Sequence, residues 1–142
     1  VYLSEHRGAY ANESELPDEA PGRPDAVLFP ISITRFAALD AAARLRSEGF
    51  RVGVRHIRQL KPQNYSQDAL LDLALCGFGV VIDDDYPDGV AKAIANDLAY
   101  ATVARVLALG LEDRTAGFAA HLDNLPPNAE RIMRFVLKEL KG

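Results

Sequence analysis

The sequence is poor in several features that would indicate a function directly, such as cysteine pairs and long apolar runs. It contains one cysteine, so no disulfide can form within the chain, and it lacks tryptophan altogether. No apolar run approaches the roughly 18 residues needed to cross a bilayer, and the N-terminal residues lack the pattern of a signal peptide. These absences lead us to expect a soluble, cytoplasmic protein that does not enter a membrane.

The charge balance excludes a general binder of nucleic acid. The chain has 16 basic and 20 acidic residues, a net charge of −4, whereas phosphate contacts require clustered Lys and Arg. Its 142 residues, 49% of them hydrophobic, suffice for one ordinary globular domain. The first residue is Val1 rather than Met, so we expect a fragment of a longer polypeptide.

Motifs that carry chemistry are also missing. There is no Gly-x-Gly-x-x-Gly segment and no Walker lysine, and the three histidines stand far apart without a metal-ligand spacing. The acids Asp83–Asp85 follow a strand, where neighbouring side chains alternate in direction and do not converge on a metal. Cys76, among leucines, is interpreted as a buried, inert thiol. We therefore predict no catalytic, cofactor-binding or metal-binding residue.

The chain divides into three parts by composition. Residues 13–25 are acidic and proline-rich and have no apolar period, so they are interpreted as an extended connector. Residues 1–12 precede it and include one short alternating strand. Residues 26–142 form the predicted compact domain.

Within that domain, buried strands alternate with helices. Continuous apolar strands separated by helices indicate a sheet covered on both faces, so we predict an α/β fold with three α/β/α layers and a mostly parallel sheet of four to five strands. Pro30, which has no N–H, should mark a strand end or an edge. The expected strands are Ala26–Ile31, Arg51–Ile57, Val80–Asp83 and Thr102–Ala108; the expected helices are Thr34–Glu48, one opened by Ser66, Gly89–Ala101 and one opened by Asn128.

Several segments, taken in order, resemble one known family. LDAAARLRSEGFRVGVRHIRQLKPQ has a helix, a Glu-Gly turn, a strand and a Leu-Lys-Pro loop; VVIDDD is a strand ending in acids; LPPNAERIMRFVLKEL is a closing helix. Together they resemble the transketolase C-terminal domain, and most closely that domain in the beta subunit of the 2-oxoacid dehydrogenase decarboxylase component. YLSEHRGAY resembles the end of the pyrimidine-binding domain that precedes it in this family.

The chain also departs from the family. Relatives have an extra strand before the domain, whereas here the connector runs directly into DAVLF, so we expect the antiparallel edge strand to be missing. Relatives have a glycine pair before the third helix, where this chain has only Gly89, and Pro30 replaces a residue that is not normally proline.

The resemblance implies a supporting role. In this family, thiamine diphosphate and Mg²⁺ are bound by other domains, so this chain would hold no cofactor and would be inactive alone. The implied partners are the preceding pyrimidine-binding domain, the thiamine diphosphate-binding subunit and an acyltransferase core, in a homodimer or heterotetramer. The complete enzyme would be a thiamine diphosphate-dependent oxidoreductase or transferase.

Two groups of residues are candidates for binding. The long loop Gly110–Asn124 carries Glu112, Asp113 and Arg114, which lie where the resembled subunit meets its partners; the alternative is a solvated loop that covers one end of the sheet.

The second group belongs to the alternative function, an autonomous module that binds a small ligand. In α/β sheets, ligands bind at the carboxyl ends of the strands. There the sequence places a possible crevice of Ser32, His56, Asn64 and Asp84. The first, second and fourth could form a Ser-His-Asp triad on paper, but no Gly-x-Ser-x-Gly elbow supports it.

Overall fold

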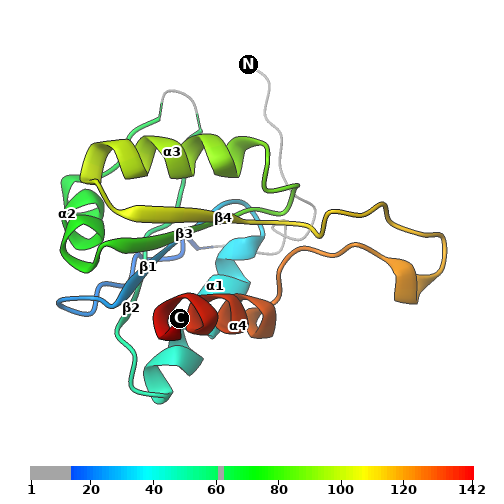
Figure 1. The fold of residues 1–142 in the computed structure, drawn as a ribbon, viewed down its shortest axis with the longest axis horizontal. Helices are drawn as coiled ribbons and strands as arrows, with labels where there is room; N and C mark the ends of the chain where they lie inside the picture. Colours follow the sequence, from blue (N-terminus) through cyan, green and yellow to red (C-terminus); the bar gives the residue numbers. More distant parts are fainter. Residues whose placement is uncertain (1–13, 61–62) are drawn as a thin grey trace.

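The computed structural model describes residues 14–60 and 63–142, and the strand expected within residues 1–12 lies outside them. Strands and helices alternate along the chain (Figure 1). The elements are β1 (Ala26–Pro30), α1 (Thr34–Ser47), β2 (Val52–Val54), α2 (Gln67–Cys76), β3 (Phe78–Ile82), α3 (Val90–Thr102), β4 (Arg105–Leu109), the short 3₁₀ helix η2 (Ala120–Leu122) and α4 (Ala129–Lys141).

The strands form a parallel sheet covered on both faces. Its order in the described residues is β2-β1-β3-β4, and each neighbouring pair runs parallel. Helices α1 and α4 cover one face, while α2 and α3 cover the other (Figure 1). The predicted three-layer α/β/α fold is confirmed.

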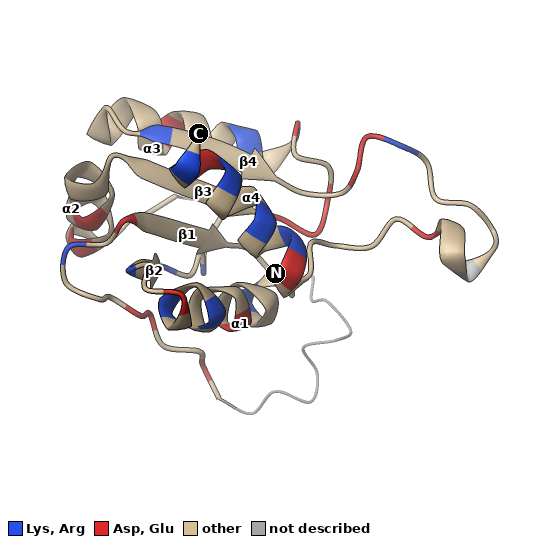
Figure 2. Cartoon of the chain, turned by 60° about the horizontal axis from the view of Figure 1, so that its bottom comes forward, with Lys and Arg blue, Asp and Glu red and all other residues tan. Residues whose placement is uncertain are grey.

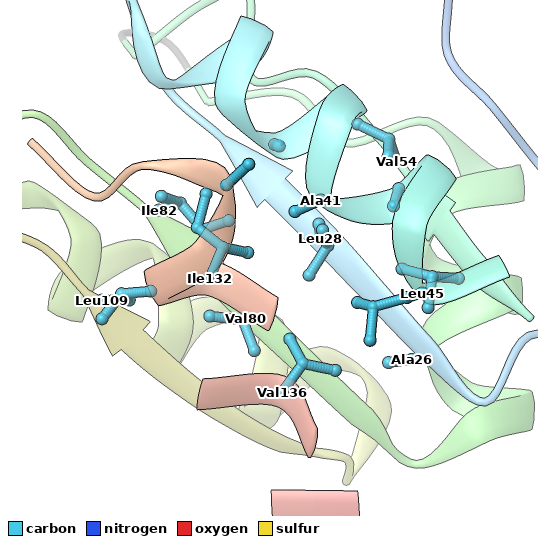
Figure 3. Packing of buried hydrophobic residues seen from close by; sticks show 14 of the residues in the cluster. Ala26, Leu28, Ala41, Leu45, Val54, Val80, Ile82, Leu109, Ile132 and Val136 are labelled. Atoms are coloured by element: carbon cyan, nitrogen blue, oxygen red, sulfur yellow. The ribbon is translucent and has the colours of Figure 1, made fainter. Parts of the chain in front are cut away.

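Alternation along the strands divides the core between the two faces. In β1, Leu28 points toward α1 and α4, whereas Val27 and Phe29 belong to the cluster on the opposite face. Figure 3 shows the first cluster, in which Ile132 and Val136 of α4 meet the sheet beside Leu45 of α1. Alanines that are fully buried let α1 lie close to the strands: Ala38, Ala41 and Ala42.

The helix boundaries follow local capping chemistry. The Ser66 hydroxyl accepts a hydrogen bond from the Ala69 N–H at 3.2 Å, and the Asn128 side chain accepts one from the Arg131 N–H at 2.9 Å. Helix α2 ends at Gly77, whose φ of 71° is a left-handed conformation that glycine adopts without strain. The predicted starts of α2 and α4 are confirmed.

Some boundaries differ from the prediction. Helix α3 runs on through Thr102, and Val103 then takes a left-handed conformation with φ of 60°, so β4 begins only at Arg105. Val90, the first residue of α3, is 45% exposed, whereas Ile94 and Leu98, at spacings of four along the helix, are fully buried. Pro30 is the last residue of β1, as its missing N–H predicts.

The edge of the sheet at β2 is covered by the connector. Glu19 forms an antiparallel bridge with Val54, with N···O distances of 2.9 and 2.7 Å. Arg46 of α1 donates from its Nε to the Val52 carbonyl oxygen at 2.8 Å. This bridge satisfies backbone groups of β2 that an open edge would leave unpaired.

None of the helices that the structure describes is both long and apolar enough to pass through a membrane.

Candidate functional site

A cavity of about 240 Å³ opens at the carboxyl end of β2, beside the first turn of α2. This is the edge of the sheet where parallel α/β folds bind ligands. Its polar lining comes from the segment after β2 and from the turn that begins α2. These lining residues include Arg55, His56, Arg58, Asn64, Tyr65 and Ser66.

The connector forms one wall of this cavity. The Asp18 carboxylate, which also lines it, accepts hydrogen bonds from the His56 N–H at 3.0 Å and from the Arg58 guanidinium at 3.1 Å. The Pro17 carbonyl oxygen lies 3.1 Å from Nε2 of His56. Residues interpreted as an extended connector are thus attached to the end of the sheet.

Ion pairs reinforce this attachment. Acidic side chains recur along the connector (Figure 2). Hydrogen bonding to Arg35, with a further contribution from Arg58, lowers the pKa of Glu15. The pairs between connector and domain are Glu15 with Arg35 and Arg58, Asp18 with Arg55 and Arg58, Glu19 with Arg46, and Asp25 with Arg51. The sequence analysis did not predict this attachment, although the acids of the connector and the arginines around β2 could have indicated it.

His56 is 6% exposed, and its environment fixes its protonation state. Burial lowers the pKa of the imidazole, and the nearby positive charge of Arg35 lowers it further, so the ring is neutral at pH 7. Since a carbonyl oxygen only accepts, Nε2 carries the proton that is donated to Pro17. Nδ1 therefore carries a lone pair, and it has no hydrogen-bond partner in the described part of the chain.

Tyr65 presents a second polar atom of this kind. Its hydroxyl oxygen is buried and also has no hydrogen-bond partner within residues 14–60 and 63–142. Burial, with a smaller effect of Asp97, raises the pKa of Tyr65 to about 12, so the hydroxyl keeps its proton at neutral pH. Both residues line the same cavity.

The four residues of the predicted crevice form two pairs. His56 and Asn64 line the cavity together. The Ser32 hydroxyl instead donates to the Asp84 carboxylate at 3.2 Å. Nε2 of His56 is directed to Pro17, and its Nδ1 has no hydrogen-bond partner in the described residues, so the imidazole does not join a Ser-His-Asp relay. The crevice itself stays a prediction.

The acids after β3 satisfy backbone groups rather than converging. Asp83 is 6% exposed and accepts from the Asp84 N–H at 2.8 Å, while Asp85 accepts from the Tyr86 N–H at 2.7 Å. Burial, together with the neighbouring Asp84 carboxylate, raises the pKa of Asp83 to about 6. Nowhere in the described residues do three or more His, Cys, Asp or Glu side chains gather in a way that could hold a metal ion.

Cys76 is half-buried rather than fully buried, because it stands in the last turn of α2. Burial raises the pKa of its thiol, which donates to the Phe78 carbonyl oxygen at 3.1 Å. The raised pKa disfavours the reactive thiolate.

The segment 110–128 projects from the body as an arm that ends near η2 (Figure 1). Arg114 braces it, donating to the carbonyl oxygens of Leu122 at 2.9 Å and Asp123 at 2.7 Å. The Asn124 side chain accepts from the Glu112 N–H at 3.1 Å and donates to the Glu112 carbonyl oxygen at 2.8 Å. These bonds give the arm a definite shape.

The three predicted docking residues, Glu112, Asp113 and Arg114, differ in their contacts within the arm. Glu112 and Arg114 form an ion pair with each other at 2.6 Å, whereas Asp113 is exposed. The first two thus shape the arm, and their contact with a partner stays a prediction. The outer part of the arm carries apolar side chains that sequence reasoning missed: Phe118, Leu122 and Leu125 are 114%, 48% and 64% exposed.

Comparisons with known proteins identify the fold. No family model matches the sequence, and no curated protein matches it. The structure is similar to a split-gene transketolase, solved as an inactive beta4 tetramer, with a TM-score of 0.69 and 23% identity. It is also similar to the 2-oxoglutarate:ferredoxin oxidoreductase of Magnetococcus marinus, with a TM-score of 0.62 and 18% identity.

These similarities cover nearly all of this chain but only part of the other proteins. The match spans 86% of this chain and 40% of the transketolase chain, and 94% of this chain and 21% of the oxidoreductase chain. The chain thus spans less than half the length of either. The predicted transketolase-like α/β fold is confirmed.

Proposed function

We propose that this chain is the C-terminal domain of a thiamine diphosphate-dependent enzyme, either the beta subunit of a 2-oxoacid dehydrogenase decarboxylase component or a transketolase-like protein. The observation that carries the proposal is the difference between the share of this chain and the share of each similar protein that the structural match covers. The fold that makes up almost all of this chain makes up only 40% and 21% of the two similar proteins. A domain of that kind contributes assembly contacts to an active centre built by other domains.

The arm supports the assembly role. Exposed apolar side chains on a segment braced by its own hydrogen bonds are typical of a surface that docks a partner with little ordering cost. Phe118 is the most exposed of the large apolar residues that the structure describes, and it stands beside the Gly117–Leu122 hydrogen bond of 3.0 Å. The partner we propose is the subunit that holds the thiamine diphosphate-binding domain, with a second copy of the chain completing a homodimer or heterotetramer. An acyltransferase core is a further partner where the enzyme is a dehydrogenase complex.

Thiamine diphosphate and Mg²⁺ are assigned to those other domains. When bound there, the cofactor would supply the nucleophilic carbon needed for chemistry at a 2-oxo carbon. The described residues of this chain contain no cluster of three or more metal-ligating side chains that could hold the ion. This chain's contribution would be to position the subunits that close around the cofactor.

The experiment is a mixing assay with light scattering. The chain is combined with the thiamine diphosphate-binding polypeptide of the same organism, and the mass of the eluted species is measured. We expect a stable complex, and we expect Phe118→Ser to weaken it at least tenfold, as loss of a buried aromatic anchor does. Leu71→Ser, which removes a 58% exposed side chain on α2, is the matched control and should leave the complex intact.

The alternative function, an autonomous small-ligand module, has one supporting observation: the cavity at the end of β2. A chain that stays monomeric in every mixture would contradict the assembly proposal and leave this alternative as the function.

A further inference from the structure

A hollow of about 870 Å³ lies at the amino ends of the strands. The residues that line it come from the chain just before β1, from the turn between α1 and β2, and from the last turns of α2 and α4. The arm leaves the sheet at the carboxyl end of β4, so it stands at the opposite end of the sheet (Figure 1). The hollow is therefore a surface separate from the arm and from the cavity at the end of β2.

Apolar side chains from three segments line this hollow. Leu75, in the last turn of α2, is 63% exposed. Phe50 and Leu140 line the same hollow and are partly buried against the core. Large apolar side chains that gather at an accessible surface mark places where another molecule binds. Because Leu75 is already exposed, such a molecule can reach this surface without opening the fold.

The hollow has more positive than negative charge. Asp25 is the one acidic residue among the described residues that line it, and its carboxylate is ion-paired with Arg51 at 2.7 Å. Arg23 also lines the hollow, and its guanidinium has no ion pair or hydrogen bond within residues 14–60 and 63–142. Nζ of Lys141 lies 5.7 Å from the centre of the Phe50 ring, and it has no ion pair with any described residue. Two cations are thus available to a partner.

The backbone of Arg23 gives independent support for a binding role. Its φ of 54° lies in the left-handed region, which residues other than glycine seldom adopt. Glycine would take this conformation without strain, yet the chain has an arginine here, directly after Gly22. Strained residues of this kind are concentrated at binding sites, where the side chain itself is needed. The exposed guanidinium of Arg23 is therefore a candidate contact for a partner.

We propose that this hollow docks an acidic polypeptide segment that carries apolar side chains. An apolar side chain of the segment packs against Leu75 and Phe50, and neighbouring carboxylates pair with Arg23 and Lys141. Apolar contact supplies most of the affinity in such an interface, and complementary charge supplies specificity.

Two other classes of partner fit the surface less well. Nucleic acid requires clustered Lys and Arg, whereas this hollow has two unpaired cations on a chain with a net charge of −4. A bilayer is bound by apolar side chains that project from a helix face, whereas Phe50 and Leu140 are partly buried in the lining of a hollow. A polypeptide can place its own side chains into the hollow.

The test adds short synthetic peptides to the full chain. The probe contains Glu and Leu; one comparator has Gln in place of Glu, and the other has Ser in place of Leu. Titration calorimetry measures the affinity, and NMR follows the backbone amides of Gly49 and Leu75. We expect the Glu-Leu peptide to bind about tenfold more tightly than either comparator, to bind more weakly at high salt, and to shift both amide resonances. No binding, equal binding of all three peptides, or tighter binding of duplex DNA or of anionic phospholipid vesicles would overturn the proposal.

Variants with matched controls locate the binding site. Leu75→Ser should weaken binding of the Glu-Leu peptide about tenfold, whereas Leu71→Ser, at a 58% exposed position of the same helix, should not change it. Lys141→Gln should weaken binding about threefold, whereas Lys92→Gln, on α3, should not. If Leu75→Ser and Lys141→Gln both left the affinity unchanged, the peptide would bind elsewhere and the proposal would be wrong.

Arg23→Gly separates a binding role from a structural one. It removes the cation and relieves the left-handed backbone, so we expect the peptide to bind about threefold more weakly while the melting temperature of the free protein stays the same or rises. A lower melting temperature with unchanged binding would mean that Arg23 serves the fold, and the proposed contact would be wrong. Phe118→Ser should leave peptide binding unchanged, so this proposal and the assembly role of the arm can fail independently.

Discussion

Nε2 of His56 lies 3.1 Å from the carbonyl oxygen of Pro17, and this contact joins the connector to the carboxyl end of β2. It also fixes the ring tautomer, because Nε2 carries the proton that is donated to Pro17. Nδ1 is then an acceptor, and it has no hydrogen-bond partner in the described residues. One short contact thus fixes both the position of the connector and the tautomer of a histidine that lines the cavity.

Loosening of the connector can be measured through Asp18. Asp18→Ala removes the acceptor of the His56 N–H and of Arg58, so we expect faster hydrogen exchange at His56 and Val54. The control is Asp88→Ala, which removes an 86% exposed partner of Lys92 and should leave both amides protected. Unchanged exchange in Asp18→Ala would mean that the backbone bridge at Glu19 holds the connector by itself.

Because the connector and Arg46 cover the β2 edge, we expect substitutions of two arginines in α1 to change the free energy of unfolding by different amounts. Arg46→Met removes the donor to the Val52 carbonyl oxygen and the ion pair with Glu19, so the free energy of unfolding should fall by about 1–3 kcal/mol. Arg44→Met breaks an exposed pair with Asp40 and should cost about 0.5 kcal/mol or less. Urea denaturation of both variants measures the difference, and equal losses would refute the proposed role of Arg46.

The base of the arm depends on the absence of a side chain at Gly110. A Cβ at this position would lie 2.2 Å from the Asp85 carbonyl oxygen and 2.9 Å from the Pro87 nitrogen, both of them backbone atoms. We expect Gly110→Ala to lower the free energy of unfolding by about 1–3 kcal/mol. Gly22→Ala meets nothing within 4 Å and should change it by less than about 0.5 kcal/mol. Thermal unfolding distinguishes the two, and a neutral Gly110→Ala would show that the arm can shift freely at its base.

Because the carboxyl of Asp83 is buried, we expect the free energy of unfolding to depend on pH. Its pKa in the folded chain is about 6, above the ordinary value, so its contribution is complete at pH below about 4 and is lost as the pH rises through 6. The free energy of unfolding should therefore fall across this window, by up to about 1.4 kcal/mol per pH unit. Asp83→Asn should flatten the slope and keep the hydrogen bond to the Asp84 N–H.

Acidic residues with lowered pKa values affect the free energy of unfolding in a different pH range. Glu15, Asp25 and Glu112 are each stabilised as carboxylates by an arginine, so their contribution is lost only as the pH falls through their lowered folded-state pKa values. His56 acts in the same pH range with the opposite sign, because burial lowers its pKa and its contribution is lost as the pH falls. Urea denaturation of the wild type and of Asp83→Asn between pH 4 and 7 therefore separates the two groups. Equal slopes in the two profiles would contradict the raised pKa of Asp83.

The fold could be predicted because its signals are local. Ser66 and Asn128 start helices through their own side-chain hydrogen bonds, and Gly77 ends one through its positive φ. The continuous apolar strands required helices on both faces, and the structure has them. Errors of a few residues arose where a helix ends without a glycine, as at Val103, which takes the left-handed conformation itself.

The site could be predicted only in part because its contacts join distant residues. His56 and Asn64 stand near each other in the sequence, and both line the cavity. The partners of His56, Pro17 and Asp18, are 39 and 38 positions away, in a segment whose composition indicated only a linker. The docking role expected of Arg114 stays a prediction, and its hydrogen bonds to Leu122 and Asp123 of the same arm were not indicated by the sequence.

The measurement that tests the central claim most directly is turnover. Two reactions are measured with thiamine diphosphate and Mg²⁺: release of CO₂ from several 2-oxo acids with an artificial electron acceptor, and ketol transfer between sugar phosphates. Each is measured for this chain alone, for the thiamine diphosphate-binding polypeptide alone and for their mixture. If this chain provides assembly contacts for an active centre built elsewhere, the chain alone is inactive and the mixture exceeds the partner alone. Turnover by the isolated chain, or a mixture no faster than the partner alone, would contradict the account.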